Sequence, residues 1–467
     1  MGKLYFTHIT NYKEVRIVKK ENIIQIIIII ILTIILGLLC KFLIFNNNSN
    51  NSNEKMQMGG PGEMGKNSNA SVEATGATEI TEETTIESGS YTSETADENA
   101  ILVNGDIDVT LSNIDVTKTG DSDGGDSTSF YGTNSAILAK SGANLTLKNI
   151  NVTTDATGAN GVFCYGGSAT TNNSSSDGTT VTISDSKITT KKDNSGGIMT
   201  TGGGTTIAKN LTINTAGTSS AAIRTDRGGG TVTVDGGTYT TTGKGSPTVY
   251  STADVTVSNA KLIAEASEGI VIEGKNSVTL DNTELTDNNT TLNGQSTTYK
   301  NIFLYQSMSG DASEGVSTFT AKNSKITTNK GDSFYVTNTT SVINLSNNTI
   351  INNDSEGYLL RAKADSWGNS GSNGGIVTFN CTNQKLTGNI VADDVSEITI
   401  NLTEGSSLES TINGEKTAKS ISLKLDSSSS LKLTGDTYLT SFEDEDSSYS
   451  NIDFNGYKLY VNGTAIN

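Results

Sequence analysis

The sequence has little proline, histidine or cysteine for its length. Its 467 residues include two Pro, one His and three Cys, whereas average usage would give about 23 Pro. Scarce proline, together with abundant Ser, Thr, Asn and Gly, favours long regular extended structure over a proline-rich disordered chain. Three cysteines cannot build a disulfide framework. The single histidine, His8, precedes a long apolar segment, and if that segment spans a membrane, histidine-based catalysis is excluded beyond it.

Basic residues are also scarce relative to acidic ones. Lys and Arg number 32 against 50 Asp and Glu, which gives a formal net charge of −18. Proteins that bind nucleic acid present basic surfaces, so this balance argues against a nucleic-acid partner.

One long apolar run is present near the N-terminus, at residues 23–45. As a helix it would be about 34 Å long, enough to cross a bilayer of roughly 30 Å. Basic residues precede it, including Lys19 and Lys20, so the positive-inside rule keeps residues 1–22 in the cytoplasm. We therefore predict a single-pass protein of the cell membrane whose remaining residues are extracellular.

Two alternatives to this anchor stay open. The apolar run could be a cleaved signal peptide, although no A-x-A site follows it. It could also belong to a lipoprotein attached through Cys40, although Leu39 is not the small residue expected before such a cysteine. Residues 46–75, rich in Asn, Ser and Gly, show no apolar period and are predicted to form a flexible linker.

From about residue 100 the chain repeats a short apolar-Thr-apolar unit that ends two residues before an Asn, Asp or Gly. Many of the steps are 23–26 residues long, and the longer steps carry insertions. Three residues after each marker lies another apolar or aromatic residue, so two columns agree over nine units. The markers are Asn113, Asn149, Asp185, Asn210, Gly236, Asn259, Asn282, Asn323 and Asn347.

Alternation within these units has period two and predicts short strands, joined at corners by Asn, Asp and Gly. A repeat of this length resembles the right-handed parallel β-helix superfamily, which includes pectate lyases, phage tailspikes and adhesin-like bacterial surface proteins. The resemblance implies an all-β fold of about 11 coils over residues 76–440. We predict a capping hairpin in residues 441–467, with its turn at Asn455-Gly456.

A further strand precedes each marker, and its third and fifth residues are expected to point outward. Six of eighteen such positions are Phe or Tyr, although aromatic residues are 6% of the chain. Such a stripe suits the stacking of sugar rings, or else a loop folds over it and buries it. Insertions near 166–179, 306–317 and 363–375 are expected to form a wall beside it. The predicted ligand-binding residues are Phe163, Tyr165, Arg224, Tyr250, Phe303, Tyr305, Tyr335 and Trp367.

Charged residues on the same stripe suggest a catalytic site. Arg224 and Asp226 share the outward face, and Glu273 lies two coils away, about 10 Å by the strand spacing. An Arg fork binds a carboxylate, and acids bind hydroxyls or calcium, so these three residues are the weak candidates for polysaccharide lyase-type catalysis. The alternative is an ion pair of little energetic value.

A loop at Gly120–Ser127 carries Asp121, Asp123 and Asp126, whose oxygens could gather around calcium. The spacing only partly resembles an EF-hand loop, and a solvated acidic loop is the alternative.

The predicted function is therefore a membrane-anchored surface protein that binds polysaccharide or another surface polymer without turning it over. A polysaccharide lyase or hydrolase that uses the same cleft is the first alternative, and a structural stalk is the second.

Overall fold

The computed structural model describes residues 73–122, 125–168, 176–294 and 296–467. The predicted cytoplasmic tail (1–22) and membrane segment (23–45) lie outside these residues, as does nearly all of the predicted linker. In the described ranges no helix is long and apolar enough to cross a membrane. The helix that they contain, α2, is short and spans Asp126–Tyr131.

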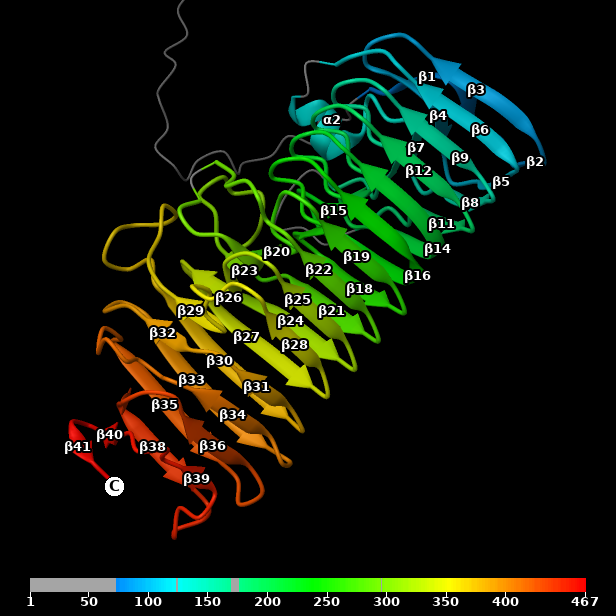
Figure 1. The fold of residues 1–467 in the computed structure, drawn as a ribbon. Helices are drawn as coiled ribbons and strands as arrows, with labels where there is room; N and C mark the ends of the chain where they lie inside the picture. Colours follow the sequence, from blue (N-terminus) through cyan, green and yellow to red (C-terminus); the bar gives the residue numbers. More distant parts are fainter. Residues whose placement is uncertain (1–72, 123–124, 169–175, 295) are drawn as a thin grey trace, which may run out of the picture. The chain divides into compact units, whose positions relative to one another are not determined.

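The described residues form stacked parallel β-sheets, consistent with a parallel β-helix (Figure 1). The first sheet has twelve strands, each paired in parallel with the corresponding strand of its neighbouring coils, on one side only at the two edges. Its strands are β1 (Thr75–Ile80), β4 (Glu98–Asn104), β7 (Ile137–Lys140), β10 (Val162–Tyr165), β13 (Ile198–Thr201), β15 (Ile223–Thr225), β17 (Val249–Ser251), β20 (Ile270–Glu273), β23 (Lys300–Tyr305), β26 (Asp332–Thr337), β29 (Leu360–Ala362) and β32 (Ile390–Ala392).

A 22-stranded sheet carries two further columns, joined because β14 and β16 run through both. The second column is β2 (Thr84–Ile86), β5 (Asp108–Ser112), β8 (Asn144–Lys148), β11 (Thr180–Ser184), β14 (Gly204–Thr215), β16 (Gly230–Thr241), β18 (Asp254–Ser258), β21 (Ser277–Asp281), β24 (Val316–Lys322), β27 (Thr339–Ser346), β30 (Gly375–Thr382), β33 (Glu397–Thr403), β35 (Ser420–Leu425) and β38 (Ser441–Asp444).

The third column follows each corner of the second. It comprises β3 (Gly89–Ser93), β6 (Ile114–Lys118), β9 (Asn151–Thr154), β12 (Lys187–Thr190), the ends of β14 and β16, β19 (Lys261–Ala264), β22 (Glu284–Asp287), β25 (Lys325–Thr328) and β28 (Thr349–Asn352). A separate four-stranded sheet continues it as β31 (Lys385–Thr387), β34 (Ser407–Ser410), β36 (Ser430–Leu433) and β39 (Ile452–Asp453).

The predicted marker column is the corner between the second and third columns. Every marker has a positive φ, for example 52° at Asn113 and 56° at Asn259. Asn, Asp and Gly tolerate this left-handed conformation better than other residues, which explains the repeat. Marker amides also bond between coils: Asn149 Nδ2 donates to Asn113 Oδ1 at 2.7 Å. The register assigned from sequence is confirmed here, because the inward residues Val257 and Leu280 are paired neighbours and fully buried.

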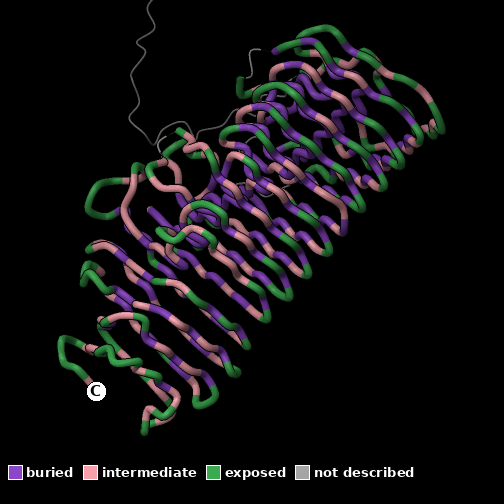
Figure 2. The backbone as a smooth tube through the Cα atoms, in the orientation of Figure 1, coloured by how far each residue is buried: buried purple, intermediate pink, exposed green. Residues whose placement is uncertain are grey.

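Buried residues alternate with more exposed ones along the second and third columns (Figure 2). The first sheet differs, because strands such as β10, β23 and β26 are buried on both faces. Its inward residues join the main core, while its outward residues form two separate clusters. We call the outward side of this first sheet the outer face.

One coil is shifted by two residues from its predicted alignment. The repeat predicts Tyr358 and Leu360 inward and Leu359 and Arg361 outward, with Tyr358 and Leu359 in the columns of Phe334 and Tyr335. Leu360 pairs with the inward Phe334, and Arg361 with the outward Tyr335, so these two residues keep their predicted directions but lie two positions earlier in the repeat. Arg361 Nε donates to the Asp332 carboxylate at 2.6 Å, so this ion pair occupies the outer face where an apolar residue was expected.

The predicted C-terminal segment also differs in detail. The antiparallel pair lies between β40 (Leu459–Val461) and β41 (Thr464–Ala465), around Asn462-Gly463. Asn455-Gly456 is instead a corner between β39 and β40, which belong to different sheets. β40 pairs in parallel with β37 (Thr437–Leu439), so the coils continue beyond residue 440. The twelve strands of the first sheet alone exceed the predicted eleven coils.

Candidate functional site

The N-terminal part of the outer face is covered by α2 and its flanking residues. Beneath them lies a buried cluster, which we call the lidded cluster: Leu102, Leu138, Phe163, Tyr165 and Met199. Gly132 ends α2 with φ 72°, and a Cβ at this position would lie 2.6 Å from the Phe163 ring. Tyr131 packs edge-on against Tyr165, with ring centroids 5.5 Å apart. The Phe163 ring is fully buried. This part of the predicted aromatic stripe is therefore covered and is not available for the stacking of sugar rings.

The middle of the outer face carries a second aromatic cluster, made of Val271, Phe303, Tyr305 and Tyr335, with Tyr250 and Trp367 at its margin. We call it the open cluster. Phe303 and Tyr305 stack with centroids 4.5 Å apart. Trp367, from the insertion at 363–375, packs against both rings at 5.3 and 5.2 Å. Phe303 and Tyr305 are themselves buried, at 3% and 9% exposure, but border the cavities described next. Tyr335 is fully buried and lines neither cavity.

Two adjoining cavities of about 250 and 240 Å³ open beside this cluster. Tyr250, Tyr305, Gly245, Pro247 and Asn293 line both of them. Together they have a size in the range of small-molecule sites. Phe303, Trp367 and Glu268 line the first cavity, and Arg224 and Ser219 line the second.

Below the cavities, Glu273 fixes the two shared tyrosines. The hydroxyls of Tyr250 and Tyr305 both donate to Glu273 Oε2, the latter at 3.0 Å, and Ser307 Oγ donates to Oε1. Glu273 is 1% exposed. Burial raises its pKa, and the three hydroxyl donors oppose that rise. Glu273 lines neither cavity. It therefore acts as a positioning residue that holds the side chains of Tyr250 and Tyr305.

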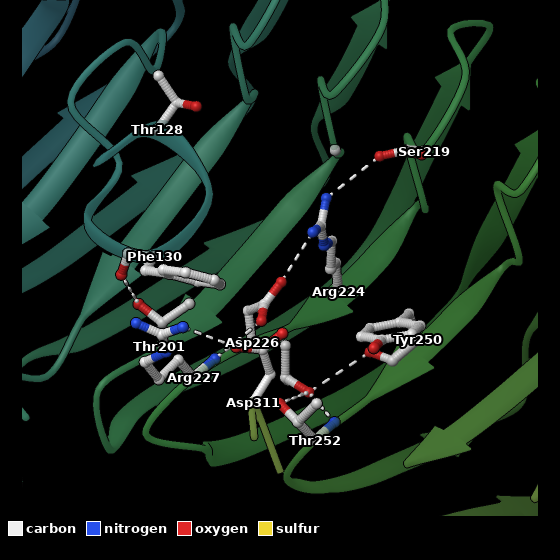
Figure 3. Close-up of polar contacts among 12 residues, drawn as sticks. Thr128, Phe130, Thr201, Ser219, Arg224, Asp226, Arg227, Tyr250, Thr252 and Asp311 are labelled. Atoms are coloured by element: carbon white, nitrogen blue, oxygen red, sulfur yellow. Dashed lines mark hydrogen bonds and ion pairs between the residues drawn. The ribbon is translucent and has the colours of Figure 1, made fainter. Parts of the chain in front are cut away.

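Arg224 and Asp226 form the ion pair considered from sequence, with Arg224 Nη2 2.7 Å from Asp226 Oδ2 (Figure 3). Arg224 Nη1 also donates to the Ser219 carbonyl at 3.1 Å. Burial raises the pKa of Asp226, and the adjacent Arg224 opposes that rise. Both terminal nitrogens of the guanidinium thus already donate to protein acceptors. Few of its N–H groups remain to bind the carboxylate of a uronate.

Arg227 links α2 to the insertion at 306–317. Its guanidinium lies 4.0 Å from the Phe130 ring centroid in α2 and donates to Asp311 at 2.8 Å, in the insertion at 306–317 (Figure 3). Segments far apart in sequence therefore meet at one side chain of the outer face.

Sequence reasoning missed a buried cation beside the first cavity. Lys300 is fully buried, with Nζ 3.6 Å from Glu268 Oε1 and 2.8 Å from Ser296 Oγ. Nζ also lies 4.4 Å from the Phe303 ring centroid. Burial lowers the pKa of Lys300, and Glu268 opposes the fall. The sequence feature that could have revealed this buried cation is Lys300 at the first position of β23, a strand that also carries Phe303 and Tyr305.

The structure thus gathers five of the eight predicted ligand-binding residues around the two cavities, and separates three. Phe163 and Tyr165 lie in the lidded cluster, and Tyr335 lies below the open one. The convergent five are Arg224, Tyr250, Phe303, Tyr305 and Trp367.

The predicted calcium site is only partly described. Asp121 Oδ1 accepts a hydrogen bond from Thr157 N at 2.7 Å, and Asp126 begins α2. Asp123 lies outside the described residues. Within the part of the chain that the structure describes, no three His, Cys, Asp or Glu side chains are grouped to hold a metal ion.

The chain matches no protein-family model, no curated protein and no solved structure. Its function must therefore be inferred from the residues of this outer face.

Proposed function

We propose that the two cavities bind a neutral saccharide unit of a surface polysaccharide. The observation that carries the proposal is the convergence of Tyr250, Phe303, Tyr305 and Trp367 on one opening. Aromatic rings supply apolar faces for sugar C–H groups, and Asn293 supplies an amide for hydroxyls. The Glu273 clamp holds two of the rings in place before any ligand arrives, which lowers the entropic cost of binding.

The charges of the site favour a neutral ligand over an acidic one. The charged side chains that line the cavities are Arg224 and Glu268. Each is already paired inside the protein, Arg224 with Asp226 and Glu268 with Lys300. A uronate would have to compete with Asp226 for the guanidinium.

The cellular location and the type of helix that we propose rest on the sequence. Residues 23–45 would anchor the chain in the cell membrane and keep the coils outside, on a right-handed helix of the pectate-lyase type. A lyase or hydrolase on the same cleft is less favoured, because Asp226 and Glu273 line neither cavity and their carboxylates are engaged by protein donors.

The experiment uses Trp367, which is the only tryptophan of the chain and lies in the first cavity. Full-length protein in detergent is screened on a glycan array, and each hit is titrated by tryptophan fluorescence and assayed for turnover. We expect a neutral glycan to change the fluorescence, and Tyr250→Ala to weaken binding about five- to tenfold.

Tyr438→Ala is the matched control, because Tyr438 stacks on Tyr460 at the C-terminal end of the coils, away from the cavities. It should leave affinity unchanged. The absence of any glycan hit would favour a structural stalk, and turnover lost in Asp226→Asn would favour the enzyme; either result would overturn the proposal.

A further inference from the structure

The interior corner between the third column and the first sheet contains a carboxylate without a partner. Asp287, the last residue of β22, is fully buried. Neither of its two oxygens has a hydrogen-bond partner among the residues that the structure describes. A buried carboxylate loses its hydration, so native structures almost always pair such a group. The unpaired oxygens of Asp287 therefore require an explanation.

Other coils carry a hydrogen-bond donor at this position. Asp287 lies between Ala264 and Thr328 in an inward column whose earlier members include Thr190. Thr190 Oγ1 donates to the carbonyl of Ser195, at the corner that follows, at 2.6 Å. An ionised carboxylate can only accept hydrogen bonds, so Asp287 cannot make this contact.

Two amide oxygens at the same corner also lack a donor. Asn289 Oδ1 and Asn301 Oδ1 are both buried and have no hydrogen-bond partner among the described residues. The nitrogens of these amides are already engaged. Asn289 Nδ2 donates to Lys300 O at 2.6 Å, and Asn301 Nδ2 donates to Thr327 O at 3.3 Å. These contacts fix the orientation of both amides, so the atoms that lack a donor are their oxygens.

The three side chains lie between two adjacent coils. Asn289 follows Asp287 by two residues. Asn301 Nδ2 is 3.0 Å from Oγ1 of Thr328, which is paired with Asp287 in the next coil. Asn301 Oδ1 points back toward the coil of Asp287, because a Cβ on Gly269 would lie 2.2 Å from this oxygen. Four acceptor oxygens without a donor therefore share one buried corner.

We propose that this corner binds a monovalent cation such as Na⁺, held by the Asp287 carboxylate and the amide oxygens of Asn289 and Asn301. Carboxylate and amide oxygens are hard ligands that suit such an ion. The local charge favours a monovalent ion over Ca²⁺. The nearby Glu268 is already paired with Lys300 at 3.6 Å, so Asp287 contributes one uncompensated negative charge. A single water molecule could donate to only two of the four oxygens.

A proton is the competing occupant. Burial raises the pKa of Asp287, the charge of Glu268 adds to that rise, and the backbone N–H of Asn289 opposes it. A protonated Asp287 would make the corner independent of the salt in solution, whereas a bound cation would not. The bound cation would also fix the start of the segment 288–299, which carries Asn293 and Ser296 to the first cavity.

The experiment compares the melting temperature of the full-length protein in detergent in three salts of equal ionic strength: NaCl, CaCl₂ and N-methyl-D-glucamine chloride. We expect the melting temperature to rise with the Na⁺ concentration, by about 2 °C for each tenfold increase above the Kd. Asp287→Thr, which restores the residue of neighbouring coils, should fold and lose this dependence. Glu284→Gln is the matched control, because Glu284 is exposed on the same strand, and it should keep the dependence.

A second measurement locates the ion. Tl⁺ replaces alkali cations, and crystals grown in thallium acetate should show an anomalous peak between Asp287 and Asn301. A melting temperature that does not depend on Na⁺ would assign the corner to a proton or to water and would overturn the proposal. Stabilisation by Ca²⁺ alone, an unchanged Na⁺ dependence in Asp287→Thr, or the absence of the anomalous peak would also overturn it.

Discussion

The lidded cluster and the open cluster are built on the same outer face from the same kinds of residue, yet they are covered differently. Over the lidded cluster, α2 lies directly on Phe163, with Gly132 in contact with the ring. Over the open cluster, Trp367 covers Phe303 and Tyr305 from one side and leaves two cavities beside Tyr250.

The difference lies in the groups beneath the rings as well as in the covering. The five side chains of the lidded cluster are apolar except for one hydroxyl, whereas the open cluster stands over Glu273 and beside Lys300. An aromatic stripe is thus a stabilising core where apolar groups close over it. It is a candidate binding surface where polar groups orient the rings.

The largest expected effect is in the lidded cluster. Phe163→Ala should lower the free energy of unfolding by about 3 kcal/mol, because a fully buried ring leaves a cavity under α2. Chemical denaturation and amide exchange of β10 would measure this loss. An effect below about 1 kcal/mol would show that α2 does not pack on this ring.

Trp367→Ala should cost less stability, about 2 kcal/mol, because this indole is only partly buried. It should nevertheless remove glycan binding, since the indole forms one wall of the first cavity. Retention on the glycan array measures this loss, because the variant has no tryptophan. The two alanine variants together would separate the clusters: one loses mainly stability and the other mainly binding. Equal loss of glycan binding in Phe163→Ala would contradict this distinction.

The pH dependence should differ between the clusters. Burial raises the pKa of Glu273, so the folded state favours its protonated form. The contribution of Glu273 to the free energy of unfolding is then fully present below the ordinary glutamate pKa of about 4.3. It is lost as the pH rises through the raised pKa of the folded state. Relative to Glu273→Gln, the wild-type chain should lose stability as the pH rises above about 4, by about 1.4 kcal/mol for each unit of pKa shift.

The lidded cluster offers the comparison for that experiment. Burial raises the pKa of Tyr165 to about 12, so its contribution should fall only above the usual tyrosine pKa of about 10. Amide exchange of β10 should therefore not respond to pH between 4 and 8 beyond the intrinsic exchange rate. A response there as large as that of β20 would remove the electrostatic difference between the clusters.

The smallest expected effect is that of Tyr250→Phe. This change deletes one hydroxyl donor to Glu273 and keeps the ring, so stability should fall by about 1 kcal/mol. Glycan affinity should fall less than in Tyr250→Ala, because the apolar face remains. Identical affinities of the Phe and Ala variants would mean that the hydroxyl, and not the ring face, supports the ligand.

Much of the fold could be predicted because its information is local. Asn113 and the other markers are needed where the backbone is left-handed, and period-two alternation assigns inward and outward residues strand by strand. The one misaligned coil, at Leu359–Arg361, follows a corner of different length.

The candidate site was only half predictable. The sequence by itself determined which residues point outward on the first sheet, because that follows from the strand period. It could not decide which of them are covered, because coverage depends on contacts between residues far apart in the chain. Trp367 reaches Phe303, and Arg227 reaches Asp311 84 residues away. Only the tertiary structure brings such partners together, since a loop settles where buried area and paired charge outweigh its lost conformational entropy.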